Sequence, residues 1–244
     1  MEIEIEECLT SLHSRHINGI FAKTPRDANR KILALIPSDA VIGIGDSTTI
    51  RQLDIIQALK ESGTRVLDPF GLRGTQIDPT DAFEWQEKVV REATISDVFL
   101  TGTNAITRDG KLVNVDAVGN RVAGMFWGHS ISIVVTGKNK IVRDLDEAFQ
   151  RIRNVIAPNH VHIRPMKSNG TKFQTPCAVT GKCRDCKAPD RVCNIFTIIE
   201  GKPLRTDLNV VIVNKDLGLS WDPSWPQSRI AKIINNHWKY SGFR

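Results

Sequence analysis

The sequence has no apolar run close to the roughly 20 residues that a membrane-spanning helix needs. Its first residues have neither the basic start nor the apolar stretch of a secretory signal peptide. It also lacks internal repeats and low-complexity segments. These absences argue against a membrane or secreted protein and predict a soluble, cytoplasmic one.

The composition is that of an ordinary globular protein, with 41% hydrophobic and 25% charged residues among 244. This length is within the range of one α/β domain, so we expect a single domain over residues 1–244.

The net charge of +6 is unevenly distributed. Residues 1–137 hold 14 Lys and Arg against 18 Asp and Glu, whereas residues 138–191 hold 12 against 5. A basic block favours nucleic acid or an acidic ligand, but it is also typical of a solvated face. Its positive side chains would also offset the charge of metal-bound thiolates.

Hydrophobic periodicity alternates between the strand and helix repeats along the chain. Strands are expected at residues 19–22, 40–44, 64–67, 97–101, 111–115, 132–136, 196–199 and 210–213. Helices are expected within residues 1–20, from the Thr24-Pro25 cap to residue 36, and at 47–62, 81–92, 121–127, 144–155 and 227–238. This alternation predicts an α/β fold with a mainly parallel sheet covered on both faces, and the Asp109-Gly110 turn predicts one antiparallel hairpin.

A glycine turn follows the expected strand 40–44 and leads into a helix. Glycines let the backbone approach a ligand, and free N–H groups at a helix start favour an anion. The alternative is a tight turn with a capping hydroxyl, because neither a P-loop nor a complete dinucleotide fingerprint is present. The candidate ligand residues in this turn are Gly43, Gly45, Ser47, Thr48 and Thr49.

A second polar group lies at the ends of the expected strands between residues 101 and 121, where open α/β sheets bind ligands. Asp116 is a candidate base and Arg121 a candidate clamp for a carboxylate or phosphate, so both are candidate catalytic residues. The alternative is a structural Asp116–Arg121 pair. The candidate ligand residues here are Thr103, Asn104, Asn114, Asp116, Asn120 and Arg121. His129 is an acid–base candidate, although an isolated histidine is more often structural.

Four of the five cysteines fall within 17 positions, as C-x5-C-x2-C-x6-C in a polar loop with Gly and Pro. Because disulfides are rare in cytoplasmic proteins, this spacing predicts a metal site made by Cys177, Cys183, Cys186 and Cys193. Cys8 lies on an apolar helix face and is expected to be a small hydrophobic residue.

The spacing favours a [4Fe–4S] cluster over zinc. Structural zinc sites usually use two separate short pairs, whereas this loop has one C-x2-C with a longer arm on each side. It resembles the C-x6-C-x2-C-x5-C run that holds [4Fe–4S] in helix-hairpin-helix DNA glycosylases. Zinc remains the alternative.

Several segments resemble the lactate-utilisation (LUD) domain family, over roughly residues 5–220. They are Leu100-Thr-Gly-Thr-Asn-Ala-Ile-Thr, Gly110-Lys-Leu-Val-Asn-Val-Asp116, Gly119-Asn-Arg-Val-Ala, Asn139-Lys-Ile-Val-Arg-Asp-Leu, the Thr-Pro-Cys block and Val211-Ile-Val-Asn-Lys-Asp-Leu-Gly218. The resemblance implies a three-layer α/β fold similar to the sugar-phosphate isomerase and CoA-transferase group, with anionic ligands bound at the turn from Gly43 to Thr49. The chain has no counterpart of the CoA-transferases' catalytic glutamate, so the reaction stays open.

Two functions from different classes follow. The first is a protein of redox or transferase type that binds a small anionic metabolite, with the cluster at residues 172–195 and a redox protein as partner. The second is a zinc-stapled basic module for nucleic acid or a protein, to which the basic C-terminal helix (224–244) would contribute. The residues of that helix with this potential are Arg229, Lys232, Trp238, Lys239, Tyr240 and Arg244.

Overall fold

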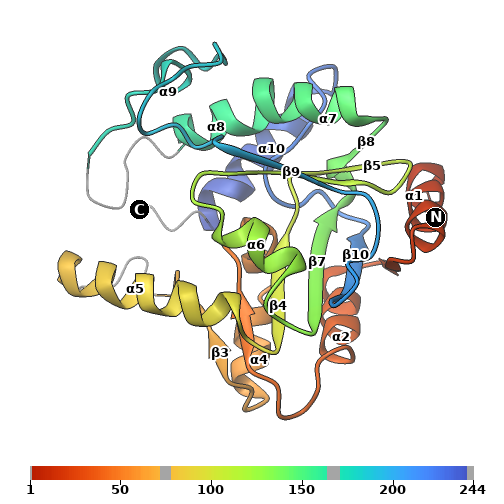
Figure 1. Cartoon of the computed structure of the whole chain (residues 1–244). Helices are drawn as coiled ribbons and strands as arrows, with labels where there is room; N and C mark the ends of the chain where they lie inside the picture. Colours follow the sequence, from red (N-terminus) through yellow and green to blue (C-terminus); the bar gives the residue numbers. More distant parts are fainter. Residues whose placement is uncertain (1, 72–77, 164–170, 241–244) are drawn as a thin grey trace.

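The computed structural model describes residues 2–71, 78–163 and 171–240, and two β-sheets organise them (Figure 1). The larger sheet has the strand order β1-β10-β7-β4-β2-β3, and every neighbouring pair is parallel. Its strands are β1 (Asn18–Ala22), β2 (Ile42–Ile44), β3 (Val66–Leu67), β4 (Val98–Gly102), β7 (Ile131–Gly137) and β10 (Asp207–Val213). The smaller sheet is mixed and consists of β8 (Ile141–Val142), β5 (Ala105–Thr107), β6 (Leu112–Asp116) and β9 (Ile195–Ile199).

Helices cover both faces of the larger sheet. On one face, α2 (Pro25–Leu33), α3 (Thr48–Arg51) and α4 (Ile55–Glu61) bury apolar side chains against β2, β4, β7 and β10. On the other face, α1 (Ile3–Ser14) and α6 (Asn120–Phe126) pack together with side chains of the smaller sheet. The molecule is therefore a three-layer α/β fold with a mainly parallel sheet, as the sequence predicted.

The smaller sheet was not expected as a separate unit. Residues 111–115 and 196–199 were expected in one central sheet, but they form β6 and β9, which pair with each other and leave the larger sheet. The reason is that β6 returns from the predicted Asp109-Gly110 hairpin and is antiparallel to β5, which starts after β4 has ended. Gly110 has a φ of 84°, a conformation that glycine adopts without strain.

The helix expected over residues 47–62 is interrupted. Asp54 has a φ of 55°, so α3 ends at Arg51 and α4 starts at Ile55. Asp is one of the few residues with a side chain that tolerates this left-handed conformation. Hydrophobic periodicity does not detect such a break because Ile50 and Ile55 both still face the core.

The helix expected over residues 144–155 continues further, as α7 (Leu145–Arg151), a π-helical turn (Ile152–Ile156) and α8 (Ala157–Ile163). Pro158 accounts for the wide turn, since it has no N–H to donate to the carbonyl of Asn154 and a proline ring in a regular α-helix would clash with that carbonyl. The turn places Arg153 beside the cysteine loop.

The remaining helices are α5 (Pro79–Thr94), α9 (Pro176–Thr180) and α10 (Gln227–Tyr240). α10 buries Ile230 and Ile233 against Leu219 and Trp221 and lies behind the sheets in Figure 1. The structure contains no helix, among the residues it describes, with the length and apolarity required to cross a membrane.

Candidate functional site

Most of the predicted ligand residues lie at the carboxyl edge of the larger sheet. β2, β4 and β7 are parallel neighbours and end at Ile44, Gly102 and Gly137, so the segments that follow them meet at one edge. Open parallel sheets bind ligands at this edge. No observation assigns a ligand to these residues, and their ligand role stays a prediction.

The glycine turn is tightly packed against its neighbours. A side chain on Gly43 would place its Cβ 2.1 Å from the carbonyl oxygen of Ala93, and one on Gly45 would lie 2.5 Å from Thr101 Oγ1. Ser47 caps α3 by accepting a hydrogen bond from the Ile50 N–H at 3.4 Å. Packing and capping therefore account for these three residues before any ligand is considered.

Lys140 lies at this edge and was not predicted from the sequence. Its side chain is buried, and Nζ donates hydrogen bonds to Thr49 Oγ1 at 2.9 Å and to the Thr103 carbonyl at 2.7 Å. Burial, followed by the charge of Arg121, lowers the pKa of Lys140 to about 7. One sequence feature points this way: Lys140 directly precedes the apolar pair Ile141-Val142, which forms the buried strand β8.

Arg121 is held by protein acceptors. Its guanidinium donates to Asn104 Oδ1 at 2.9 Å, to the Gly102 carbonyl at 3.4 Å and to the Val115 carbonyl, and its Nε lies 3.7 Å from Asp116 Oδ2. Burial lowers the pKa of Arg121, and Asp116 and Asp46 oppose this effect. The pairing of Arg121 with Asp116, considered above as the structural alternative, is thus present, and few donors remain to clamp a ligand.

The other polar side chains join the same network. Thr103 Oγ1 lies 2.9 Å from Asn114 Oδ1, and Asn104 Oδ1 also accepts the Val115 N–H at 3.0 Å. Asp116 Oδ2 accepts the Val122 N–H at 3.2 Å at the start of α6. Thr48 and Asn120 are the first residues of α3 and α6.

Three buried polar atoms near this edge have no hydrogen-bond partner in the described chain: Thr101 Oγ1, Asn114 Nδ2 and His237 Nδ1. Unsatisfied buried groups are rare in folded proteins and are costly, which favours a missing partner such as a ligand or water. His237 comes from α10 and was not predicted. Burial, then the charges of His160 and Lys140, lower its pKa to about 3.

His129 does not join this group. It precedes β7, at the opposite end of that strand, and stacks on Phe99 with ring centroids 5.6 Å apart.

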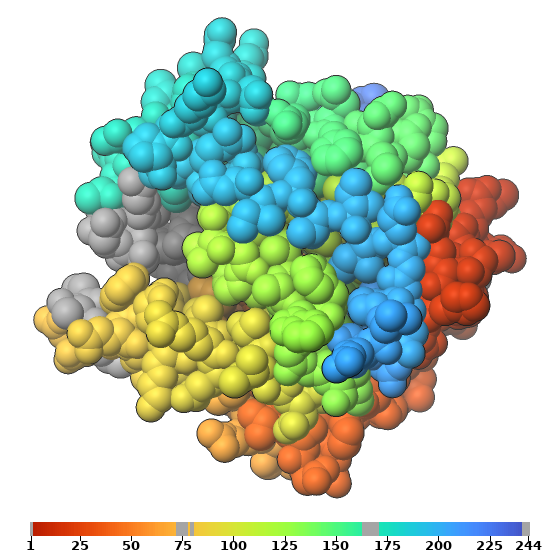
Figure 2. All heavy atoms as spheres, in the orientation of Figure 1, coloured from red at the N-terminus to blue at the C-terminus, as the bar shows by residue number. Residues whose placement is uncertain are grey.

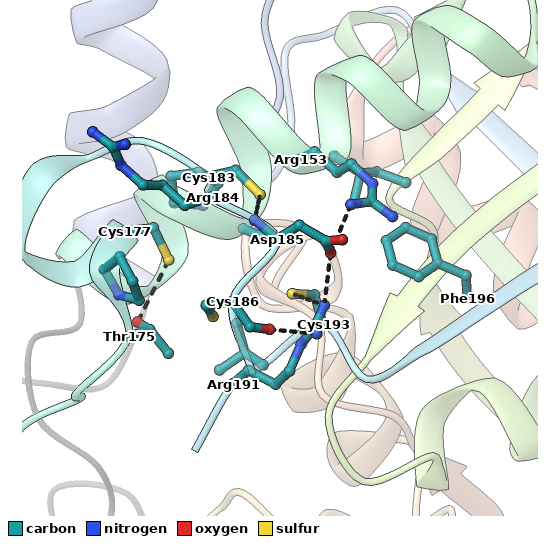
Figure 3. A pocket seen from close by; sticks show the side chains of 15 residues that line it. Arg153, Thr175, Cys177, Cys183, Arg184, Asp185, Cys186, Arg191, Cys193 and Phe196 are labelled. Carbon is teal, nitrogen blue, oxygen red and sulfur yellow. Dashed lines mark hydrogen bonds and ion pairs between the residues drawn. The ribbon is translucent and has the colours of Figure 1, made fainter. Parts of the chain in front are cut away.

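The four loop cysteines line one pocket, together with Ile152, Phe196 and the arginines 153, 184 and 191 (Figure 3). The loop forms a protruding corner of the molecule, at the upper left of Figure 2. All four thiols are partly exposed and none is in a disulfide. Cys8, by contrast, lies on the buried face of α1, and burial raises the pKa of its thiol to about 12.

Hydrogen bonds reach three of the four sulfurs. The Asp185 N–H donates to Cys183 Sγ at 3.5 Å, Arg191 Nη2 donates to Cys193 Sγ at 3.4 Å, and the Cys177 thiol donates to Thr175 Oγ1 at 3.4 Å. Asp185 in turn pairs with Arg153 Nη1 at 3.1 Å (Figure 3).

The thiols share a pocket without forming a closed ligand set. Across residues 2–71, 78–163 and 171–240, no group of three or more His, Cys, Asp or Glu side chains is close enough to hold a metal ion. The donor types nevertheless fit a thiolate metal centre, because soft sulfur ligands share one pocket with hydrogen-bond donors and cationic side chains.

Comparison with solved structures gives low similarity. A DUF162-family protein from Deinococcus radiodurans is 13% identical, with 87% of this chain and 95% of that chain covered and a TM-score of 0.43. Ribose 5-phosphate isomerase A from Neisseria gonorrhoeae is 18% identical, with 50% and 54% covered and a TM-score of 0.33. The delta subunit of eIF2B from Chaetomium thermophilum is 13% identical, with 61% and 54% covered and a TM-score of 0.28.

No curated protein matches the sequence. The family model of the LUD domain, however, matches residues 5–213, which is most of the chain. The match covers both sheets and the cysteine loop, and the chain belongs to the LUD domain family.

Proposed function

We propose that this LUD-family protein binds a small anionic metabolite at the carboxyl edge of the larger sheet and holds a [4Fe–4S] cluster in the cysteine pocket. Its role would be of redox or transferase type in carboxylate metabolism, with a redox protein as partner in the first case. The observation that carries the proposal is that all four loop cysteines line one pocket.

The surroundings of the thiols favour a cluster. Arg153, Arg184 and Arg191 line the pocket and would offset the net negative charge of a centre bound by four thiolates. Hydrogen bonds to the sulfurs, such as those from Asp185 and Arg191, are among the features that set the reduction potential of iron–sulfur clusters. When bound, a [4Fe–4S] cluster would supply one-electron transfer.

The anion site is supported by the charges at the sheet edge. Lys140 is buried there and has no carboxylate partner among the described residues, and a buried charge needs compensation by an opposite charge. A metabolite with a carboxylate or phosphate would supply it.

The basic C-terminal helix gives less support to a nucleic-acid module. Arg229 is engaged by Asp216 at 2.7 Å and lies over the Trp225 ring, 3.5 Å from its centroid. This side chain therefore already has a carboxylate partner and an aromatic one within the protein.

Anaerobic purification with iron, sulfide and zinc analysis and a visible spectrum tests the proposal. We expect about four irons per chain and a broad brown absorbance. One zinc per chain without colour would instead make the site structural and favour a metal-stapled binding module. Absence of any metal after reconstitution with iron and sulfide would refute the metal site.

A further inference from the structure

We propose that Lys140 is the residue that contacts the anion, that the anion carries a small carboxylate or phosphate group, and that its binding draws a proton onto the Lys140 amine. This inference rests on the proposed anion site and adds to it a contact residue, a ligand chemistry and a proton linkage.

The position of Lys140 fits an anion contact. β7 ends at Gly137, and a short 3₁₀ turn then brings the Lys140 side chain back under the strand ends, where the residue is 5% exposed. Its two hydrogen-bond acceptors, Thr49 Oγ1 and the Thr103 carbonyl, are both neutral. An ammonium has three donors, so one remains for a ligand.

No carboxylate in the described part of the chain forms an ion pair with Lys140. Burial and, after it, a second cation, Arg121, instead lower the pKa of Lys140. The Arg121 guanidinium is fixed by Gly102 and Asn104, the two neighbours of Thr103. Residues 102–104 thus accept hydrogen bonds from both Arg121 and Lys140. A buried ammonium beside a second cation is unstable, and an incoming anion would reverse that balance.

The other titratable groups around this site come from several elements. Asp116 at the end of β6 pairs with Arg121, and Asp46 in the turn after β2 acts on Arg121 and His237. His237 on α10 is affected by the charge of Lys140 and by that of His160 on α8. The pKa of Lys140, about 7 without a ligand, would rise when an anion binds, because an anion favours the charged amine.

Donors for the rest of the anion are available. Among the described residues, the fully buried Asn114 Nδ2 and Thr101 Oγ1 have no hydrogen-bond partner. Asn114 Oδ1 is bonded to Thr103 Oγ1, and Thr101 Oγ1 lies 2.5 Å from the position that a Cβ on Gly45 would take. A ligand oxygen at this edge would give them the partners that they lack among residues 2–71, 78–163 and 171–240.

Titration calorimetry with oxalate, pyruvate, lactate and inorganic phosphate tests the inference on the whole chain. Each anion is measured in two buffers with different ionisation enthalpies, near pH 7.5. We expect the heat of binding to depend on the buffer, showing proton uptake, and the affinity to fall about tenfold per pH unit above about pH 7. Binding of the three carboxylates alone would assign a carboxylate ligand, and binding of phosphate would assign a phosphate group.

Three variants locate the proton. Lys140→Met should bind at least about tenfold more weakly, as expected for the loss of one charge-assisted contact. Lys140→Arg should retain binding but lose the proton uptake, because arginine stays protonated. Lys138→Met is the matched control: Lys138 pairs with Glu2, and the variant should behave as wild type.

The outcomes separate the two proposals. If the wild type binds an anion but Lys140→Arg still takes up a proton, or Lys140→Met binds equally well, the role of Lys140 is wrong and the metabolite site remains. If none of the four anions binds to the wild type, the anion site itself is refuted, whatever the metal content.

Discussion

Arg191 links two of the loop cysteines: its Nη2 donates a hydrogen bond to Cys193 Sγ at 3.4 Å while its Nη1 donates to the Cys186 carbonyl at 2.6 Å. The Cys193 sulfur raises the pKa of Arg191, as expected when the guanidinium donates to an electron-rich acceptor. A donor to a ligating sulfur stabilises the more negative state of a cluster and raises its reduction potential.

Arg191→Met should therefore lower the midpoint potential of the proposed cluster. Loss of a contact worth about 1 kcal/mol between the two redox states corresponds to a shift of roughly 50 mV for one electron. The measurement is a potentiometric titration followed by electron paramagnetic resonance. Arg184→Met is the matched control, since Arg184 lines the same pocket with no hydrogen bond to a thiol in the described structure. Equal shifts in both variants would assign the effect to net charge and not to the hydrogen bond.

Replacing any one of the four loop cysteines with serine should release most of the iron. A serine oxygen is a harder ligand than a thiolate and does not suit the cluster. Cys8→Ala should leave the iron content unchanged, because Cys8 is buried and donates to the Thr107 carbonyl far from the loop in sequence. The test is iron and sulfide per chain after identical anaerobic reconstitution. Retention of iron in the Cys177, Cys183, Cys186 and Cys193 variants would contradict the ligand assignment.

Local patterns predicted the individual elements well. Thr24 caps α2 as expected, accepting the Asp27 N–H at 3.1 Å, and the parallel strands follow from the alternation of strand and helix. Periodicity does not specify which strands pair, so the separate sheet that contains β6 and β9 was not predicted.

The sheet-edge site was predicted only in part, because local patterns do not show which side chains the fold buries. Strand ends identified Thr103, Asn104 and Arg121, which the fold brings to one edge. Lys140 was missed because the surrounding sequence is basic, and the apolar pair Ile141-Val142 after it does not by itself bury a lysine. The tertiary structure shows that this lysine is buried.

The stability of the protein should rise with pH above neutrality because of Lys140. The folded pKa of about 7 lies below the ordinary lysine value of 10.5, so between these values the unfolded chain binds a proton that the folded one does not. The free energy of unfolding then increases by up to about 1.4 kcal/mol per pH unit from this group. Urea denaturation of the wild type and Lys140→Met at several pH values measures the difference in slope, in which other groups cancel.

The control for this slope is Lys138→Met, which removes a lysine paired at the surface with Glu2 and should keep the wild-type pH dependence. A wild-type curve parallel to that of Lys140→Met would show that Lys140 is protonated in the folded state at neutral pH.

Gly43→Ala should destabilise the fold by about 1–3 kcal/mol, the range for overpacking in a core. The new Cβ would lie 2.1 Å from the Ala93 carbonyl oxygen and 2.6 Å from Ser96 Oγ, so α5 would have to move away from β2. Gly201→Ala is the matched control, since its Cβ would be 3.6 Å from the nearest atom, and the change should stay within about 0.5 kcal/mol. Urea denaturation gives both values.

If Gly43→Ala kept wild-type stability but lost anion binding, Gly43 would be needed for close approach of a ligand. Loss of stability with anion binding retained would show that packing requires the glycine.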